Sequence, residues 1–314
     1  MISVCLHSLR STIACGLNCI IALSLVPLFL LAGLPKVIKT NFHVHSTFCD
    51  GKDTPEQIAQ VALKKGIAIL GFSSHSMYPF SSDWHIPVKE HAVYTAEIAR
   101  VKKLYEGKLK IWCGFEADYI AGVCAPDFDH YKEFKPDYLI GSVHFVPSDT
   151  GFIEADGSAE EVLLGIQKHF AGNAKRAVQE YFALERQMLK SCCFTFLGHA
   201  DVIRKPNVHG LLFDENSSWY KSEIDALAHE VAKSGVCIEI NTGGILRGGM
   251  KAPYPAPRFL SILHDLNVPV TINTDAHTSD GLDFWFENAI LYATQAGYKE
   301  LAFFDEGNLR FQRI

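Results

Sequence analysis

The sequence of 314 residues lacks the patterns by which several common enzyme classes are recognised. It contains no GxxxxGK[ST] loop and no GxSxG elbow, which argues against a P-loop nucleotide hydrolase and an α/β-hydrolase. None of its nine cysteines is followed six residues later by an arginine, so the CxxxxxR loop of thiol phosphatases is missing. The segment HEVAK at His229 has no second histidine, and it therefore does not match the HExxH helix of zinc proteases.

Basic charge and paired cysteines are also scarce. Lysine and arginine number 29 against 35 acidic residues, a net charge of -6, whereas a nucleic-acid-binding protein normally has a basic surface. No two cysteines have CxxC spacing, and this pattern is typical of reduced thiols in a cytoplasm. After an apolar leader, no linker rich in Gly, Pro or Ser divides the chain, so we expect a single domain over residues 37–314.

The apolar leader comprises residues 1–36, and residues 12–34 carry no charge. Their length and flanks are typical of a signal peptide or a single membrane anchor. A start codon assigned too far upstream is the third interpretation, because the rest of the chain reads as an intracellular enzyme. We expect a cytoplasmic protein. The alternative is one that is membrane-anchored or exported through residues 1–35, and only an anchor implies membrane contact.

Short apolar runs alternate with amphipathic stretches throughout residues 37–314. Strands are expected at 37–44, 68–74, 110–117, 138–145, 194–198, 236–241 and 268–274, and helices at 54–65, 91–105, 159–189, 222–234, 257–266 and 282–296. This alternation implies parallel strands joined by right-handed crossovers. Seven repeats favour an α/β fold of the distorted (β/α)7 TIM-like barrel type, with an open doubly wound sheet as the alternative.

Six of the 14 histidines stand where the expected strands end, namely His43, His45, His75, His144, His199 and His277. Glu116 ends the third strand, and Asp275 belongs to the seventh. A parallel barrel builds its active site at these carboxyl ends. Residues two apart on a strand point to one face, as His43 and His45 do. The other histidines are expected to be solvated or locally capped: His7, His85, His91, His130, His169, His209, His229 and His264.

These imidazoles and carboxylates predict a metal site. Buried together without partners they would be costly, since buried polar and charged groups need partners. Neutral imidazole and carboxylate are preferred ligands of zinc, iron and manganese. Asp50 follows His45 in the loop HSTFCDGK, which is short enough to fold back over the strand ends. We therefore interpret Asp50 as a ligand in preference to a simple turn residue.

The ordered motifs resemble the polymerase-and-histidinol-phosphatase (PHP) superfamily. They are HVHSTFCDG at 43–51, SSHS around His75, GFEAD around Glu116, GSVHF around His144, GHAD around His199 and NTDAH at 273–277. Within it, GSVHF, GHADVIRK and EINTGGILR most resemble the PHP-type histidinol-phosphatases. The resemblance covers about residues 38–290 and implies a distorted seven-stranded barrel that holds three divalent metal ions (Zn, Mn or Fe).

Carried over by position, the resemblance assigns four ligands to the first ion: His43, His45, Glu116 and Asp275. Glu116 would bridge to a second ion held by His144 and His199. Asp50, His75 and His277 would hold the third ion. The family loop usually has threonine or serine where Gly243 and Gly244 stand. The implied activity is hydrolysis of a small-molecule phosphate ester, L-histidinol phosphate first, with no nucleic acid as partner.

Arg204 and Arg247 follow the fifth and sixth strands, and a guanidinium can grip phosphate with two parallel hydrogen bonds. A surface salt bridge is the alternative, above all for Arg204. Asp201 would orient His199 or protonate the leaving group, and we favour orientation.

Other candidate functions are a PHP phosphoesterase acting on nucleotides or phosphotyrosine, a proofreading exonuclease domain and a non-catalytic metal-binding module. Substrate choice is expected in the loops 77–87, 119–134 and 147–157. Phe80 and Trp84 in the first loop either face an imidazole or form the core of a lid.

Overall fold

The computed structural model describes residues 37–207 and 210–314. The predicted leader, residues 1–36, and His209 lie outside the described residues. The part from Val37 to Ile314 forms one compact unit. Among the described residues, no helix is both long enough and apolar enough to span a membrane.

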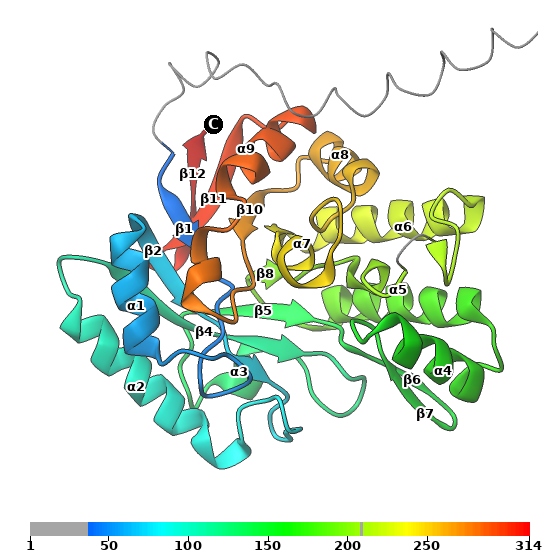
Figure 1. Cartoon of the computed structure of the whole chain (residues 1–314), viewed down its shortest axis with the longest axis horizontal. Helices are drawn as coiled ribbons and strands as arrows, with labels where there is room; N and C mark the ends of the chain where they lie inside the picture. The colour runs from blue at the N-terminus through cyan, green and yellow to red at the C-terminus, as the bar shows by residue number, and fades with distance from the viewer. Residues whose placement is uncertain (1–36, 208–209) are drawn as a thin grey trace, which may run out of the picture. The chain divides into compact units, whose positions relative to one another are not determined.

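Seven parallel strands form the centre of this unit (Figure 1). They are β1 (Lys39–Asn41), β2 (Ile67–Phe72), β4 (Lys110–Asp118), β5 (Tyr138–Ser142), β8 (Phe196–Leu197), β9 (Cys237–Asn241) and β10 (Val270–Asn273), adjacent in that order. A short strand, β3 (His75–Ser76), pairs with β4. Just past β1 and β10, Val44 and Ala276 form a parallel bridge, in which the His45 N–H donates to the Ala276 carbonyl at 2.9 Å. The bridge joins the first and last strands, so the predicted distorted seven-stranded barrel is confirmed.

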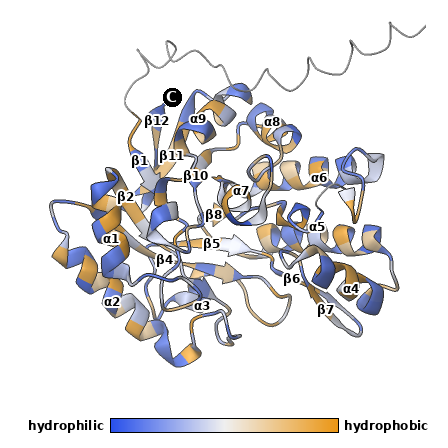
Figure 2. Ribbon diagram, in the orientation of Figure 1, coloured by the Kyte–Doolittle hydropathy of each residue, from blue (hydrophilic) through white to orange (hydrophobic). Residues whose placement is uncertain are grey.

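Helices lie outside the strands and turn their apolar faces inward (Figures 1 and 2). They include α1 (Pro55–Lys64), α2 (His91–Leu104), α6 (Ser218–Ser234) and α8 (Pro257–Asp265). Helix α1 begins where the sequence predicts it, because Thr54 and Gln57 form a reciprocal capping box and Pro55 occupies the first turn. Its residues Ile58, Ala59 and Ala62 are fully buried, as the 3.6-residue period requires.

The amino-terminal end of the barrel is filled by apolar side chains. The Tyr138 hydroxyl, on β5, is within donor distance of two carbonyls, those of Phe42 just after β1 (2.6 Å) and of Phe72 at the end of β2 (2.9 Å). Gly71 and Gly114 leave room for this ring, since a Cβ on either glycine would collide with Tyr138. The apolar core inside the barrel therefore lies at the amino-terminal end of the strands, and the polar groups lie at the carboxyl end.

Two predicted helices are wrong in their extent. The expected helix 159–189 is divided into α4 (Ala159–His169) and α5 (Ala174–Ser191). The chain between them turns through left-handed conformations at Ala171 (φ 51°) and Gly172 (φ 77°), which end α4. The expected helix 282–296 is shorter, because residues Ser279–Asp283 form a 3-10 turn before α9 (Phe286–Gln295).

Two hairpins and two short helices were not anticipated. Strands β6 (Phe145–Ser148) and β7 (Gly151–Glu154) pair antiparallel inside the expected substrate loop, and β11 (Glu300–Asp305) pairs with β12 (Asn308–Arg313) after the last helix. Phe304 of β11 contacts Phe42 and Tyr138, so the second hairpin adds to the core at the amino-terminal end of the barrel. The short helices are α3 (Phe128–Tyr131) and α7 (Gly243–Gly248).

We predict that a chain without residues 1–35 folds and keeps its activity. The barrel, its core and the predicted metal ligands all belong to the compact unit that starts at Val37. Thermal unfolding and catalytic rate of the truncated and full-length proteins, purified side by side, are the measurements. An inactive truncated protein beside an active full-length one would contradict the prediction.

Candidate metal centre

The predicted metal ligands are brought together at the carboxyl ends of the strands, from every strand of the barrel except β2 and β9. They form overlapping groups whose ligand atoms lie within 4.8 Å of one another. His43 and His45 follow β1, His75 is in β3, His144 follows β5 and His199 follows β8. The complete set is His43, His45, Asp50, His75, Glu116, His144, His199, Asp275 and His277.

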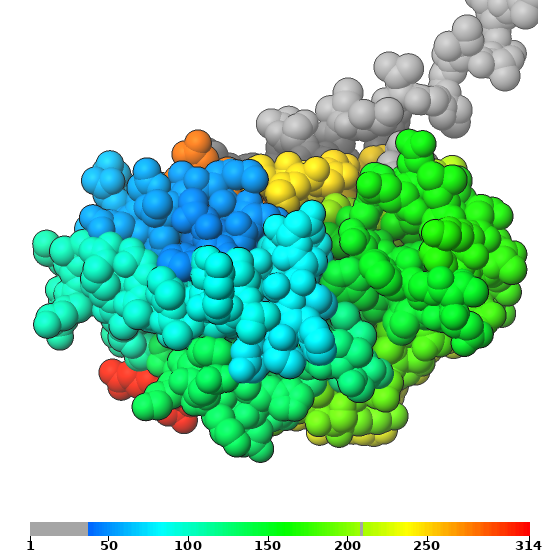
Figure 3. Space-filling view, turned by 90° about the horizontal axis from the view of Figure 1, so that it is seen from below, coloured from blue at the N-terminus to red at the C-terminus, as the bar shows by residue number. Residues whose placement is uncertain are grey.

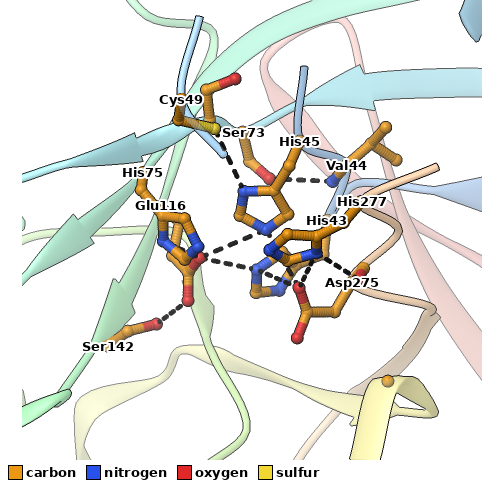
Figure 4. Close-up of polar contacts among 12 residues, drawn as sticks. His43, Val44, His45, Cys49, Ser73, His75, Glu116, Ser142, Asp275 and His277 are labelled. Carbon is orange, nitrogen blue, oxygen red and sulfur yellow. Dashed lines mark hydrogen bonds and ion pairs between the residues drawn. The ribbon is translucent and has the colours of Figure 1, made fainter. Parts of the chain in front are cut away.

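Glu116 of β4 is the centre of this cluster. Its carboxylate oxygens lie within 3.4 Å of ring nitrogens from five imidazoles, those of His43, His45, His75, His144 and His199. Glu116 is 1% exposed, and His43 and His45 are fully buried. Figure 4 shows Glu116 and the rings of His43, His45 and His75, together with Asp275 and His277, pointing toward one common space. Such convergence places one carboxylate where it can serve two cations.

Charge in the cluster is uneven. Although burial opposes it, the nearby His43, His75 and His144 hold the pKa of Glu116 well below its usual range. Burial, followed by the neighbouring His277 and His75, depresses the pKa of His45 well below the ordinary value. An ionised carboxylate and a neutral imidazole are the forms in which these side chains bind metal ions.

The cluster also fits metal ions because many of its polar atoms have no hydrogen-bond partner in the protein. The orphaned buried atoms include His43 Nε2, His45 Nε2 and Glu116 Oε2, and Asp275 Oδ1 and His199 Nδ1 belong to the same group. A buried polar atom without a partner is costly, and so many in one place are rare in folded proteins. Divalent cations would satisfy them together, and the oxygen and nitrogen donors suit zinc, iron or manganese.

Two carboxylates that hold the imidazoles were missed by the sequence analysis. Glu239 of β9 contacts His43 Nδ1 at 2.9 Å, and it also accepts from the backbone N–H of His199 at 2.9 Å. Asp118 of β4 contacts His144 Nδ1 at 2.6 Å. Such partners fix the ring orientation and leave the other nitrogen for the metal. Asp118 is two residues beyond Glu116 on one strand, so period-two alternation was the signal that would have found it.

The site belongs to a known family. Residues 41–243 match the family model described as PHP domain. This chain belongs to the PHP domain family. The most similar relatives include a protein of Deinococcus radiodurans named "Probable histidinol-phosphatase", 28% identical over 264 residues, covering 83% of this chain and 95% of the relative. The histidinol-phosphatase of Bacillus subtilis is 24% identical and covers 79% of this chain and 97% of its own length.

A solved structure shares the fold of this PHP chain. It is the histidinol phosphate phosphatase of Lactococcus lactis, complexed with zinc, L-histidinol and phosphate. It is 22% identical, covers 87% of this chain and 98% of its own chain, and has a TM-score of 0.65. The likeness supports the closed barrel described above.

A cavity of about 480 Å³ opens beside the metal ligands of the PHP chain. Its wall combines basic side chains with acidic and aromatic ones. The residues that line it beyond the metal ligands are Lys52, Trp84, Glu154, Asp156, Gly157, Val202, Lys205, Gly243, Gly244, Arg247 and Tyr254. In the space-filling view of Figure 3, the cyan segment after β3 borders the green part of the chain. There Trp84 stacks on Phe145 of β6, with ring centroids 5.7 Å apart.

Arg247 lies in this cavity, as the sequence predicts for a residue that contacts phosphate. Its guanidinium donates to the Asp275 carboxylate at 2.7 Å and to the Asp275 carbonyl. The side chain remains 34% exposed, so further N–H groups are available to a ligand. A Cβ at Gly243 would lie 3.0 Å from the Asp275 side chain, which would have to shift by a few tenths of an ångström to accept it.

Arg204 and Asp201 differ from their predicted roles. The Arg204 guanidinium pairs with Glu215 at 3.0 Å and Asp201 at 3.4 Å, and its side chain is only 10% exposed. Asp201 accepts the backbone N–H of Ala256 at 2.8 Å, and the carboxylate that accepts the backbone N–H of His199 is that of Glu239. The neighbouring Lys205, and not Arg204, lines the cavity. Arg204 and Asp201 therefore hold two loops together behind the site.

Two histidines expected to be solvated or locally capped are buried, and of these His91 also has local contacts, from Nδ1 to the carbonyls of Pro87 and Val88. His85 is 2% exposed and contacts the Asp118 carboxylate, and His91 is fully buried and contacts the Ser76 hydroxyl at 2.8 Å. Sequence position in a loop and at a helix start gave no sign of these partners. Their partners come from other elements. Asp118 of β4 is 33 residues from His85, and Ser76 of β3 is 15 residues from His91.

We predict that Glu116→Gln lowers kcat by about a hundredfold or more and reduces the metal content of the protein. One carboxylate oxygen is replaced by an amide nitrogen that cannot bind a cation, and each lost ion removes several kcal/mol of transition-state stabilisation. Elemental analysis and phosphate release are the measurements.

The matched control for this variant is Glu185→Gln. Glu185 is equally buried, its pKa is raised to about 8 by burial, and its carboxyl bonds to the Tyr181 hydroxyl away from the cluster. Because Glu185 is largely neutral at pH 7, the amide should be tolerated there. Unchanged metal content and activity in Glu116→Gln would contradict the prediction that Glu116 bridges two metal ions.

We further predict that Asp118→Asn weakens metal affinity by about ten- to a hundredfold, the usual effect of losing a partner of a metal-ligating histidine. An asparagine cannot accept from both His144 and His85, because one side of its amide is a donor. Metal dissociation constants from competition with a chelator provide the measurement. Asp137→Asn, which changes a carboxylate bonded to the Cys113 N–H, is the control. Equal affinities in both variants would count against this role of Asp118.

Proposed function

We propose that this chain is a metal-dependent phosphate monoester hydrolase that converts L-histidinol phosphate and water into L-histidinol and phosphate. The observation that carries the proposal is the cluster of nine potential metal ligands, Glu116 at its centre, beside a cavity that Arg247 lines. The PHP family membership and the histidinol-phosphatase names of its relatives point to the same substrate.

In this proposal three divalent ions, zinc, manganese or iron, occupy the cluster. His43, His45, Glu116 and Asp275 hold the first. The second shares Glu116 with His144 and His199, and the third is held by Asp50, His75 and His277. The grouping of His45, Asp50, His75 and His277 within 4.8 Å supports the third site. Bound there, the ions would supply a water-derived nucleophile at neutral pH and positive charge for the phosphoryl oxygens.

The protein's own groups then bind and orient the ester. Arg247 faces the cavity from α7 and is held by Asp275, so its free N–H groups have a fixed direction toward a phosphoryl group. Lys52 adds positive charge to the cavity wall, whereas the Lys205 ammonium group pairs with Asp156 at 3.2 Å. Glu154 lies in the same wall and suits the ammonium group of an amino alcohol. The cavity thus offers groups for the phosphate and for the ammonium group of the ester.

We also place the enzyme in the cytoplasm. Among the described residues, the six cysteines Cys49, Cys113, Cys124, Cys192, Cys193 and Cys237 are all free thiols. Unpaired thiols in this number are typical of a reducing compartment.

The direct test is phosphate release from a panel of esters by the full-length protein. The panel comprises L-histidinol phosphate, 2-aminoethyl phosphate, phosphotyrosine and a nucleoside monophosphate. We expect the highest kcat/KM for L-histidinol phosphate. If phosphotyrosine or the nucleotide is clearly preferred, the protein is a phosphatase with a substrate other than histidinol phosphate. If no ester releases phosphate, the assignment as an enzyme is rejected.

We predict that Arg247→Ala lowers kcat/KM by about ten- to two-hundredfold, because a charge-assisted hydrogen bond is worth about 1.5–3 kcal/mol. Arg247→Lys should recover only part of the loss, since a point charge cannot make the two-pronged contact. Inhibition by inorganic phosphate should weaken in parallel, while metal content stays the same.

Arg204→Ala is the comparison for this variant. Its guanidinium is committed to Asp201 and Glu215, so we expect a lower melting temperature with little change in phosphate inhibition. If Arg247→Ala retains full kcat/KM and full phosphate inhibition, the arginine does not contact the phosphoryl group.

A further inference from the structure

A row of hydrogen bonds leads from a metal donor to the loop 77–87. His144 Nδ1 contacts Asp118 Oδ1 at 2.6 Å, and Asp118 Oδ2 contacts His85 Nε2 at 2.5 Å. His85 Nδ1 in turn lies 2.7 Å from the Ser82 hydroxyl. His144, Asp118 and His85 are each at most 3% exposed, so the row is shielded from water.

The protons of this row can be placed from its chemistry. An ionised carboxylate only accepts hydrogen bonds, so the ring nitrogens that contact the Asp118 carboxylate are the donors. His144 therefore donates from Nδ1 and keeps Nε2, which lies 3.4 Å from Glu116, for a cation. His85 donates from Nε2 and accepts the Ser82 hydroxyl on Nδ1. Each member thus has one partner on each side, and the row is complete.

Trp84 is held by the outer end of the row. Its indole stacks on the His85 ring with centroids 3.7 Å apart and planes 28° apart. The same indole meets His75 at 4.7 Å and His144 at 5.4 Å, nearly perpendicular to both rings. Trp84 lines the cavity beside the metal ligands. It therefore forms an aromatic wall next to the place where an ester would react.

The loop is anchored at both ends. At its start Tyr78 packs on His91 and Phe134, whereas Phe80 beyond it is 51% exposed. The loop rejoins the barrel at His85 and at Ile86, whose N–H donates to the His75 carbonyl at 2.9 Å. At this second end, the hydrogen bonds of the His85 ring join the loop to Asp118 and so to His144.

We propose that His85 is a positioning residue: through Asp118 it couples Trp84 to the metal donor His144, so that the indole forms the wall on which the leaving group of the phosphate ester lies. This inference rests on the proposed function for the identity of that group, an imidazole ring. A flat ring gains from an aromatic wall, whereas a short aliphatic leaving group does not reach it. Loss of His85 should therefore weaken binding of the ring without removing the chemistry.

The test compares His85→Ala and His85→Gln on two esters, L-histidinol phosphate and 2-aminoethyl phosphate, which lacks the ring. His85→Ala should raise KM for L-histidinol phosphate about three- to tenfold, the worth of an aromatic contact. Its kcat should change little, and so should the Michaelis constant for the ester without a ring. Glutamine should restore most of the loss, since its amide N–H can donate to Asp118. If His85 only stabilised the fold, its loss would change KM for the two esters by the same factor.

The matched control is His91→Gln. His91 is also buried and contacts Tyr78 of the same loop, but its hydrogen bonds go to Ser76, Pro87 and Val88. Its KM values for the two esters should keep the wild-type ratio. A wild-type ratio in His85→Ala as well would overturn the inference.

A second readout needs no turnover. The emission of Trp84, isolated by subtracting the spectrum of Trp84→Phe, should change when Zn²⁺ is added to metal-free wild-type or His91→Gln protein, and should change much less in His85→Ala. Equal responses in all three proteins would overturn the coupling. If the wild-type protein hydrolyses neither ester, the proposed function fails, and this titration still decides whether His85 links Trp84 to the metal centre.

Discussion

The carboxylate of Glu116 lies in the centre of five imidazoles, and the placement of the strands around it can be understood from this contact. A charged group in the protein interior is stable only with compensating charge and well-directed partners. Here several ring nitrogens and carboxylate oxygens are buried close together without a hydrogen-bond partner. Cations between the donors would remove this conflict, so the arrangement is best understood as the protein part of a metal centre.

The barrel makes such a centre possible because the side chains that stabilise it and the predicted metal ligands lie at opposite ends of the strands. At the amino-terminal end of the strands, Tyr138, Phe42 and Phe304 fill the interior with aromatic packing. At the carboxyl end, the strands that carry donors point them into one space, and the ladder of parallel strands fixes their mutual distances. Outer carboxylates such as Asp118 and Glu239 then hold individual rings in the orientation that leaves one nitrogen free.

The barrel and the metal ligands could be predicted because both are written in local patterns. Alternating apolar runs give the strands, and histidines at the ends of those runs give the site. The break between α4 and α5 was missed because Ala171 carries no sequence signal for a left-handed turn. The two hairpins were missed because each lies within or after a segment that lacks clear alternation.

Side-chain partners that are distant in sequence were the least predictable feature. In the sequence His85 is an ordinary loop histidine, but in the fold it contacts Asp118 of β4. Arg204 has the sequence position of a phosphate ligand, but in the fold its guanidinium pairs with Glu215 and Asp201. In both cases the sequence gives the residue, but the tertiary fold chooses its partner. Arg247 differs because its partner, Asp275, is itself one of the predicted metal ligands, so its position in the cavity goes with that cluster.

The central claim is that the donors around Glu116 bind divalent ions on which the chemistry depends. The most direct measurement is a chelator titration of the full-length protein in which bound metal and phosphate release are followed on the same samples. Activity should fall in step with metal loss and return when Zn²⁺ or Mn²⁺ is restored. Protein that has lost its metal but still hydrolyses phosphate esters at the original rate would contradict this claim.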